Sequence, residues 1–172
     1  MQSRAPTKAR SPLYNAEQRR RRDASRWTLV QGILAPLQFI AFFVSLCLVL
    51  RYLLTGNGEG VAALSVVVKT LFLYAIMLTG SLWERDVFGR YLFAPAFFWE
   101  DIVSMAVLAL HTAYLIALFF QLGDVRAQMT IALLAYTAYL INAAQFLLKL
   151  RMARLESRAL PDHFGGPLAV RE

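Results

Sequence analysis

Four long runs of apolar residues follow one another along the chain, and short polar segments separate them. The runs cover about residues 27–54, 61–83, 98–122 and 127–150. A helix needs about 20 mainly apolar residues to cross the roughly 30 Å hydrocarbon core of a bilayer, and each run reaches that length. The pattern therefore predicts four membrane-spanning helices.

The connections after the first and third runs are short and rich in turn-forming residues. They read TGNGEG after Leu54 and QLGDVR from Gln121. Short connections of this kind favour antiparallel neighbours. We expect an all-α integral membrane four-helix bundle with up-down-up-down topology. Its domain organisation is a flexible basic arm at 1–26, a helical domain at 27–155 and a polar tail at 156–172.

The basic residues gather at the two ends of the chain and in the connection around residues 84–97, which holds Arg85 and Arg90. Lys and Arg beside membrane spans mark the cytoplasmic side. We therefore expect both termini and this loop to be cytoplasmic. The other basic residues that support this orientation are Arg4, Lys8, Arg10, Arg19, Arg20, Arg21, Arg22, Arg26, Lys149, Arg151, Arg154, Arg158 and Arg171.

Composition agrees with a membrane protein, since 58% of the residues are hydrophobic. A net charge of +7 would suggest nucleic-acid binding in a soluble protein, but here the positive-inside pattern explains it, so no nucleic-acid partner is expected. The single cysteine, Cys47, lies inside an apolar run, which leaves no disulfide framework or cysteine metal motif.

Several polar residues interrupt the apolar runs and are candidates for chemistry. Glu100, Ser104 and His111 form one stripe, because eleven helical residues span about 16 Å and return to within about 20° of the same face. Ionisable groups in hydrocarbon are costly, so a functional site is the default interpretation. The alternatives are that Glu84, Glu100 and Asp101 lie among headgroups, where Glu100 and Asp101 would also stabilise a helix N-terminus, and that His111 is a buried structural residue.

Amide side chains and one lysine complete the set of polar residues within the spans. Gln38, Asn142 and Gln145 are either substrate contacts or, more often for such residues, hydrogen-bonding links between helices. Lys69 lies about eight residues from the outer end of its run, and we expect its side chain to reach the far interface by snorkelling.

An aromatic cluster borders the loop before the third run. It either forms an ordinary interfacial belt or provides a flat apolar wall for a planar ligand, with Arg85 or Arg90 free to meet a carboxylate. Its members are Tyr91, Phe93, Phe97, Phe98 and Trp99.

Three stretches of the chain are long and unusual. They read SPLYNAEQRRRRDASRWTLVQGILAPLQF, VVKTLFLYAIMLTGSLWERDVFGRYLFAPAFFWEDIVSMAVLALHTAYL and YLINAAQFLLKLRMARL. They resemble the vinyl bacteriochlorophyllide hydratase family of phototrophic bacteria over about residues 11–155. The resemblance implies a hydro-lyase of bacteriochlorophyll biosynthesis. Such an enzyme adds water to the C3 vinyl group (formerly numbered 2-vinyl) of a chlorophyllide-type tetrapyrrole and gives a 1-hydroxyethyl group.

That implied chemistry fits the polar residues. Vinyl hydration needs a general acid for the terminal carbon and a group that deprotonates water, with water as co-substrate and no cofactor. Burial favours the neutral form of a carboxyl group, as a general acid requires. We expect Glu100 or Asp101 to donate the proton and the other acid, or Glu84, to position water. His111 would be a partner base or a ligand to the magnesium of the substrate, and no metal of the protein's own is expected.

Two non-catalytic alternatives stay open. The chain would then be a membrane pigment carrier or assembly factor for photosynthetic complexes, or a structural subunit of a membrane complex. In each case the expected location is the cytoplasmic membrane of a phototrophic bacterium, where the lipid bilayer is a partner and contact with other pathway enzymes is a further alternative.

Overall fold

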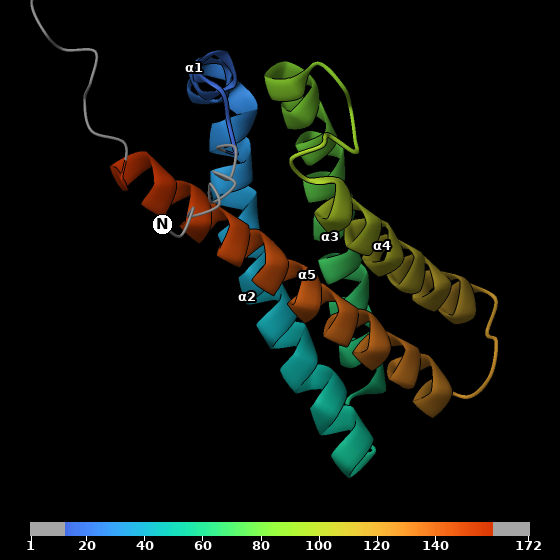
Figure 1. Ribbon diagram of the computed structural model, residues 1–172. Helices are drawn as coiled ribbons and strands as arrows, with labels where there is room; N and C mark the ends of the chain where they lie inside the picture. Colours follow the sequence, from blue (N-terminus) through green and yellow to red (C-terminus); the bar gives the residue numbers. More distant parts are fainter. Residues whose placement is uncertain (1–12, 160–172) are drawn as a thin grey trace, which may run out of the picture.

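The computed structural model describes residues 13–159, and within this range the chain forms five α-helices and no strand (Figure 1). They are α1 (Ala16–Ala24), α2 (Arg26–Thr55), α3 (Glu59–Phe88), α4 (Phe98–Phe119) and α5 (Val125–Ala159). The prediction of an all-α fold is confirmed. Residues 1–12 of the predicted arm and 160–172 of the predicted tail lie outside the described residues.

Four of these helices, α2 to α5, are long and apolar enough to cross a membrane. Helix α3 continues past the predicted end at Trp83, because the polar residues that follow remain helical until Gly89 adopts a left-handed conformation with φ of 79°. Helix α5 likewise continues beyond the apolar run to Ala159. The apolar runs therefore located the helices but placed some ends too early.

The segment before α2 is more ordered than a flexible arm. Asn15 caps α1 through a capping box with Gln18, whose backbone N–H donates to Asn15 Oδ1 at 2.8 Å. The ring of Tyr14 is buried and stacks on Phe88 with ring centroids 5.9 Å apart. Burial raises the pKa of Tyr14 to about 12, an effect that the nearby Arg22 partly offsets. Local capping and aromatic packing thus fix this segment against the end of α3.

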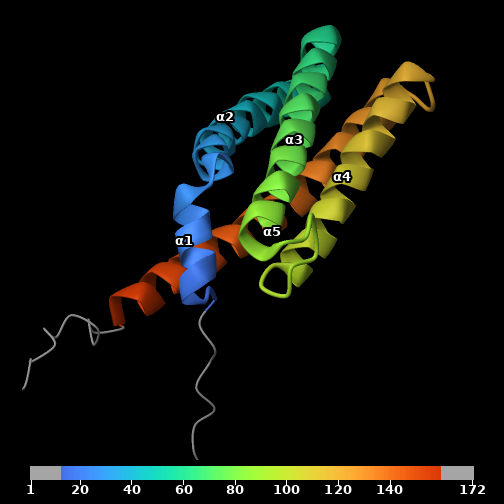
Figure 2. The same cartoon turned by 90° about the horizontal axis from the view of Figure 1, so that it is seen from above.

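The long helices form two pairs, α2 with α3 and α4 with α5, and α5 also crosses α2 diagonally (Figures 1 and 2). The core between them combines aromatic rings with small residues that let the helices approach closely. Phe42 of α2 packs on Tyr136 and Tyr139 of α5, with centroid distances of 5.4 and 5.0 Å. By contrast, α3 and α4 pack less closely against each other than the helices of either pair.

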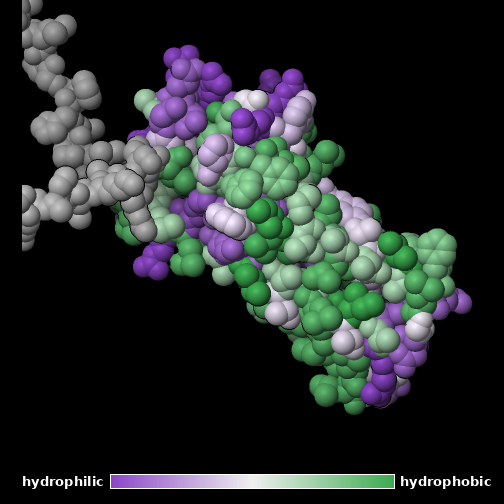
Figure 3. Space-filling view, turned by 45° about the vertical axis from the view of Figure 1, so that its right-hand side comes forward, coloured by the Kyte–Doolittle hydropathy of each residue, from purple (hydrophilic) through white to green (hydrophobic). Residues whose placement is uncertain are grey.

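The outer surface is that of a protein surrounded by lipid. One face shows a broad hydrophobic band, with hydrophilic residues gathered at its two ends (Figure 3). Large apolar side chains such as Leu64, Leu134 and Leu147 point outward along the spans. Such wide apolar exposure would be unfavourable in water and is expected in a bilayer.

Candidate functional site

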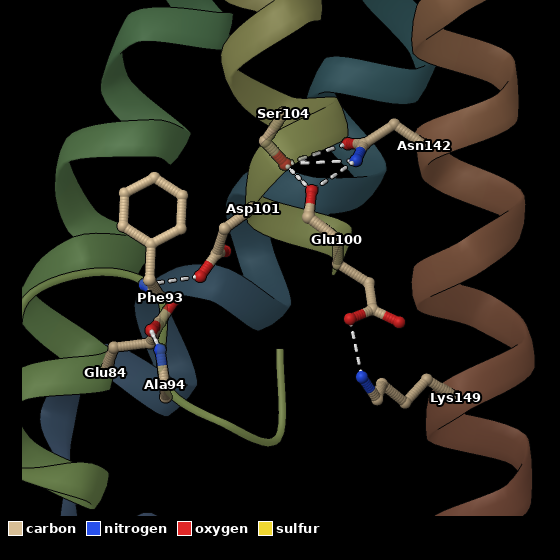
Figure 4. Close-up of polar contacts among 8 residues, drawn as sticks. All are labelled: Glu84, Phe93, Ala94, Glu100, Asp101, Ser104, Asn142 and Lys149. Atoms are coloured by element: carbon tan, nitrogen blue, oxygen red, sulfur yellow. Dashed lines mark hydrogen bonds and ion pairs between the residues drawn. The ribbon is translucent and has the colours of Figure 1, made fainter. Parts of the chain in front are cut away.

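Two carboxyl groups meet at the loop that joins α3 to α4. Glu84 comes from the last turns of α3 and Asp101 from the first turn of α4, and both are nearly fully buried. Consecutive backbone amides of the loop hold them: Phe93 N–H donates to Asp101 Oδ2 at 2.7 Å, and Ala94 N–H donates to Glu84 Oε2 at 3.1 Å (Figure 4). The loop therefore acts as a clamp on both acids.

The local sequence explains why the loop reaches back to these acids. Gly89 ends α3 in the left-handed region, and Phe93 also has a positive φ of 59°, which is uncommon for a residue with a bulky side chain. Phe97 N–H then donates to the Ala94 carbonyl oxygen at 2.8 Å, which closes a turn before α4. The strained backbone at Phe93 is offset by the hydrogen bond that it makes to Asp101.

Because consecutive amides of one loop bind them, the carboxyl groups of Glu84 and Asp101 are held next to each other. Ionised carboxylates are acceptors only, so two of them can hydrogen-bond to each other only when one carries a proton. Like charges at such a distance also disfavour full ionisation of both. Two carboxyl groups in this arrangement can hold one proton between them, as acid–base chemistry requires.

Glu100, the acid next to Asp101, has a different environment. Its Oε2 accepts a hydrogen bond from Lys149 Nζ of α5 at 2.5 Å, and the lysine lies over the ring of Phe97 at 4.8 Å. This ion pair joins α4 to α5. The two adjacent acids of α4 thus face different partners.

The side-chain amide of Asn142 links two helices near Glu100, which is the structural alternative that the sequence left open for this residue. Asn142 Nδ2 of α5 donates to the Glu100 carbonyl oxygen at 3.1 Å and to Ser104 Oγ at 3.0 Å (Figure 4). The side-chain oxygens of Gln38 and Gln145 are buried without a hydrogen-bond partner among the described residues. Of the three predicted amide contacts, only Asn142 is joined to the carboxylate region by hydrogen bonds described here.

His111 is buried at a distance from the carboxyl pair. Ten residues of α4 separate it from Asp101, about 15 Å along the axis. Its Nδ1 lies 2.8 Å from the Val107 carbonyl oxygen, and its Nε2 lies 2.7 Å from Lys69 Nζ. Because both ring nitrogens have protein partners, the geometry leaves no free lone pair for a magnesium ion. The predicted polar stripe of Glu100, Ser104 and His111 does face the interior, since all three are buried.

Lys69 does not snorkel, and that expectation was wrong. Its side chain is fully buried, with Nζ 4.1 Å from the ring centroid of Tyr139 and 5.5 Å from that of Tyr136. The two aromatic faces and His111 replace the hydration of the ammonium group, which makes an interior position tolerable.

The predicted aromatic wall is divided between two environments. Phe97 is buried, where it packs against Trp83 and Phe146 with centroid distances of 5.6 and 5.9 Å. The remaining members point outward, which is typical of an interfacial belt. Arg85 lies over the ring of Tyr91 at 4.9 Å, and Arg90 is exposed nearby. The exposed members are Tyr91, Phe93, Phe98 and Trp99.

A groove of about 440 Å³ lies between α3 and α4, and the sequence did not indicate it. We call it the α3–α4 groove. Helix α3 contributes Met77, Leu78 and Ser81, the loop contributes Leu92, and α4 contributes Met105 and Leu108. Tyr74 and Thr112 line its far end, where the tyrosine hydroxyl and Thr112 Oγ1 are 2.8 Å apart. The groove forms where α3 and α4 pack less closely than the helices of either pair.

The sequence left open whether Glu100 or Glu84 partners Asp101, although a signal for Glu84 was present. Glu84 and Asp101 border the same short loop at the same end of two neighbouring helices. The sequence favoured the adjacent pair Glu100 and Asp101 instead, yet neighbouring residues on a helix point about 100° apart and do not face each other.

Comparison with known proteins identifies relatives over nearly the whole chain. The family model described as 2-vinyl bacteriochlorophyllide hydratase matches residues 14–152. A protein named 2-vinyl bacteriochlorophyllide hydratase from Cereibacter sphaeroides is 61% identical over 160 residues, which cover 92% of this chain and 99% of the relative. One of the same name from Rhodobacter capsulatus is 62% identical over 149 residues, which cover 87% and 86%. No solved structure gives a significant match.

Proposed function

The chain belongs to the 2-vinyl bacteriochlorophyllide hydratase family, and on that basis we propose that it adds water to the C3 vinyl group of a chlorophyllide-type tetrapyrrole. The product carries a 1-hydroxyethyl group, and the enzyme is a hydro-lyase of bacteriochlorophyll biosynthesis. The observation that carries the mechanistic part is the buried Glu84–Asp101 pair clamped by the amides of Phe93 and Ala94.

Vinyl hydration proceeds in two steps that a single carboxyl pair can serve. The proton held by Glu84 and Asp101 first goes to the terminal vinyl carbon, and the π electrons form the new C–H bond. The cation left on the carbon next to the ring is delocalised over the macrocycle. A water oxygen then bonds to that carbon and gives a proton back to the pair. The net result is the addition of one water, and the pair ends in its starting state.

The backbone clamp has a specific part in this cycle. After the proton leaves, both carboxyl groups are ionised and repel each other. The N–H groups of Phe93 and Ala94 already point at one oxygen of each acid, so the additional negative charge is stabilised without reorganisation of the loop. Glu100 would not take part directly, because Lys149 holds it as an ion pair.

We place the reaction at the cytoplasmic face of the cytoplasmic membrane of a phototrophic bacterium. The basic residues around the α3–α4 loop and at both chain ends support a topology in which the four spans run up-down-up-down with both termini inside. A chlorophyllide is flat and apolar with one carboxylate, so it suits an interface where Arg85 or Arg90 meets that acid. Water is at hand there, and the reaction needs no cofactor.

The test is conversion with isotope-labelled water. The full chain is produced in a host that lacks the pathway, and membranes receive chlorophyllide a in water enriched in heavy oxygen. We expect the extracted pigment to gain one labelled water and its long-wavelength absorption band to shift to the blue as the vinyl conjugation is lost. Unchanged pigment recovered from membranes with folded, pigment-retaining protein would overturn the hydratase proposal in favour of a carrier.

A further inference from the structure

The α3–α4 groove ends close to the carboxyl pair. Ser81 lies three residues before Glu84 on α3, and Met105 lies four residues after Asp101 on α4, so each is one helical turn from an acid and on the same face. Leu92, the loop residue of the groove, directly precedes Phe93, whose amide holds Asp101. The loop end of the groove therefore lies one helical turn from the acid pair, which is buried behind its lining residues.

The polar groups of the groove stand at its two ends. At the far end the hydroxyl groups of Tyr74 and Thr112 are hydrogen-bonded to each other. At the loop end Ser81 lies on α3 one helical turn before Glu84. Ten residues of α3 separate Tyr74 from Glu84, about 15 Å along the helix axis. Between these ends the lining is methionine and leucine, an adaptable apolar surface.

The groove also has an open side. Leu78, which lines it, is 66% exposed, and it lies within a span long and apolar enough to be surrounded by lipid. The volume of about 440 Å³ falls within the range of about 300–1,000 Å³ that is typical of small-molecule sites. An apolar slot of this kind accepts a ligand that is dissolved in the bilayer better than one that arrives from water.

We propose that the α3–α4 groove holds the tetrapyrrole ring, which slides in edge-on from the lipid so that its vinyl group reaches the Glu84–Asp101 pair. The assignment rests on the proposed function for the nature of the occupant. The faces of a flat macrocycle would contact the apolar walls, while its reactive edge would point to the loop end, where Glu84 and Asp101 lie one helical turn from Ser81 and Met105. The exposed aromatic belt at Tyr91, Phe93, Phe98 and Trp99 then lies beside the entrance and does not form the binding wall.

Binding can be measured apart from turnover with a pigment that cannot be hydrated. The probe is the 3-ethyl analogue of chlorophyllide a, in which the vinyl group is already saturated. Saturable binding to the purified full chain, displaceable by the vinyl pigment, is compared for wild type, Met105→Trp and Ile116→Trp. Ile116 is on the same helix but exposed and outside the groove, so it controls for the added indole.

We expect Met105→Trp to weaken binding roughly tenfold or more, because the indole fills the slot, and Ile116→Trp to bind like wild type. Ser81→Leu provides a second narrowing of the groove if Met105→Trp does not fold. Wild-type binding by the folded Met105→Trp and Ser81→Leu variants would overturn the assignment. So would a loss of binding seen only in Trp99→Ala, a variant of the exposed aromatic belt. Failure of wild type to hydrate vinyl pigment would instead refute the proposed function, so the two failures are distinguishable.

Discussion

Replacing either acid of the carboxyl pair by its amide tests the mechanism most directly. In Asp101→Asn the new Oδ1 still accepts the Phe93 N–H, and the new NH₂ group can donate to the Glu84 carboxylate. The hydrogen-bonded geometry is thereby kept while the transferable proton is removed. Glu84→Gln makes the mirror-image change, in which the amide oxygen still accepts from Ala94.

The expected loss follows from the value of a positioned general acid. Proton donation by a side chain contributes about 10²–10⁴-fold to a rate, which corresponds to about 2.7–5.4 kcal/mol of transition-state stabilisation at about 1.36 kcal/mol per factor of ten. Each single variant should lose turnover within that range. Because the two acids share one proton and act as a unit, the double variant should be little worse than either single variant.

The assay is turnover of chlorophyllide a by purified protein in lipid, followed by extraction and measurement of the hydroxyethyl product. Glu100→Gln serves as the matched control, since it makes the same chemical change at the neighbouring position of α4 but acts on the ion pair with Lys149. We expect it to lose stability while the folded fraction turns over within a few-fold of wild type.

Two results would refute this reasoning. If folded Asp101→Asn keeps near-wild-type turnover, the proton does not come from this pair. If the losses in the double variant multiply, Glu84 and Asp101 work independently and the shared-proton mechanism is wrong.

Three further predictions concern the surroundings of the site. Lys149→Met should lower the free energy of unfolding by about 3 kcal/mol, because it leaves the Glu100 carboxylate without its ion-pair partner. Adding Glu100→Gln should recover most of this loss, as measured by unfolding in detergent. No recovery would mean that the lysine acts through another contact. Lys69→Met should leave turnover within a few-fold of wild type, since Lys69 is fifteen residues and about 22 Å along α3 from Glu84. A large loss of turnover in folded protein would mean that His111 and its partner Lys69 take part in the reaction. Burial raises the pKa of Tyr14 from 10.0 to about 12, so its neutral ring stabilises the packing of α1 fully below pH 10. This contribution to stability is lost as the pH rises towards 12. Alkaline unfolding that starts at the same pH in Tyr14→Phe as in wild type would contradict the prediction.

The helices could be predicted from sequence because each apolar run satisfies its backbone hydrogen bonds within itself and needs only length to cross a bilayer. The ends of the helices were harder to predict from the sequence. Charged residues such as Glu84 and Arg85 look like the end of a span, yet the helix stops only where Gly89 turns left-handed. Helix α1 carries the Asn15–Gln18 capping box in plain sequence, but its run of arginines suggested a flexible arm.

The site was only partly predictable, for a physical reason. Composition and position drew attention to Glu84, Glu100 and Asp101, because acids beside apolar spans are costly. Which acids meet depends on how α3 and α4 approach and on where the loop turns back, and both are tertiary properties. The ion pair of Glu100 with Lys149 spans 49 positions, and the groove depends on the limited contact of α3 with α4. No periodicity in one sequence encodes either feature.

The clamp on the carboxyl pair uses main-chain donors, and this shapes how the loop can vary over evolutionary time. Every residue except proline supplies the same N–H group, so the side chains at positions 93 and 94 can change while the clamp persists, provided that position 93 tolerates its positive φ. Insertions or deletions between Gly89 and Phe97 would shift both amides off register at once. Selection should therefore hold the length of this loop more tightly than its composition.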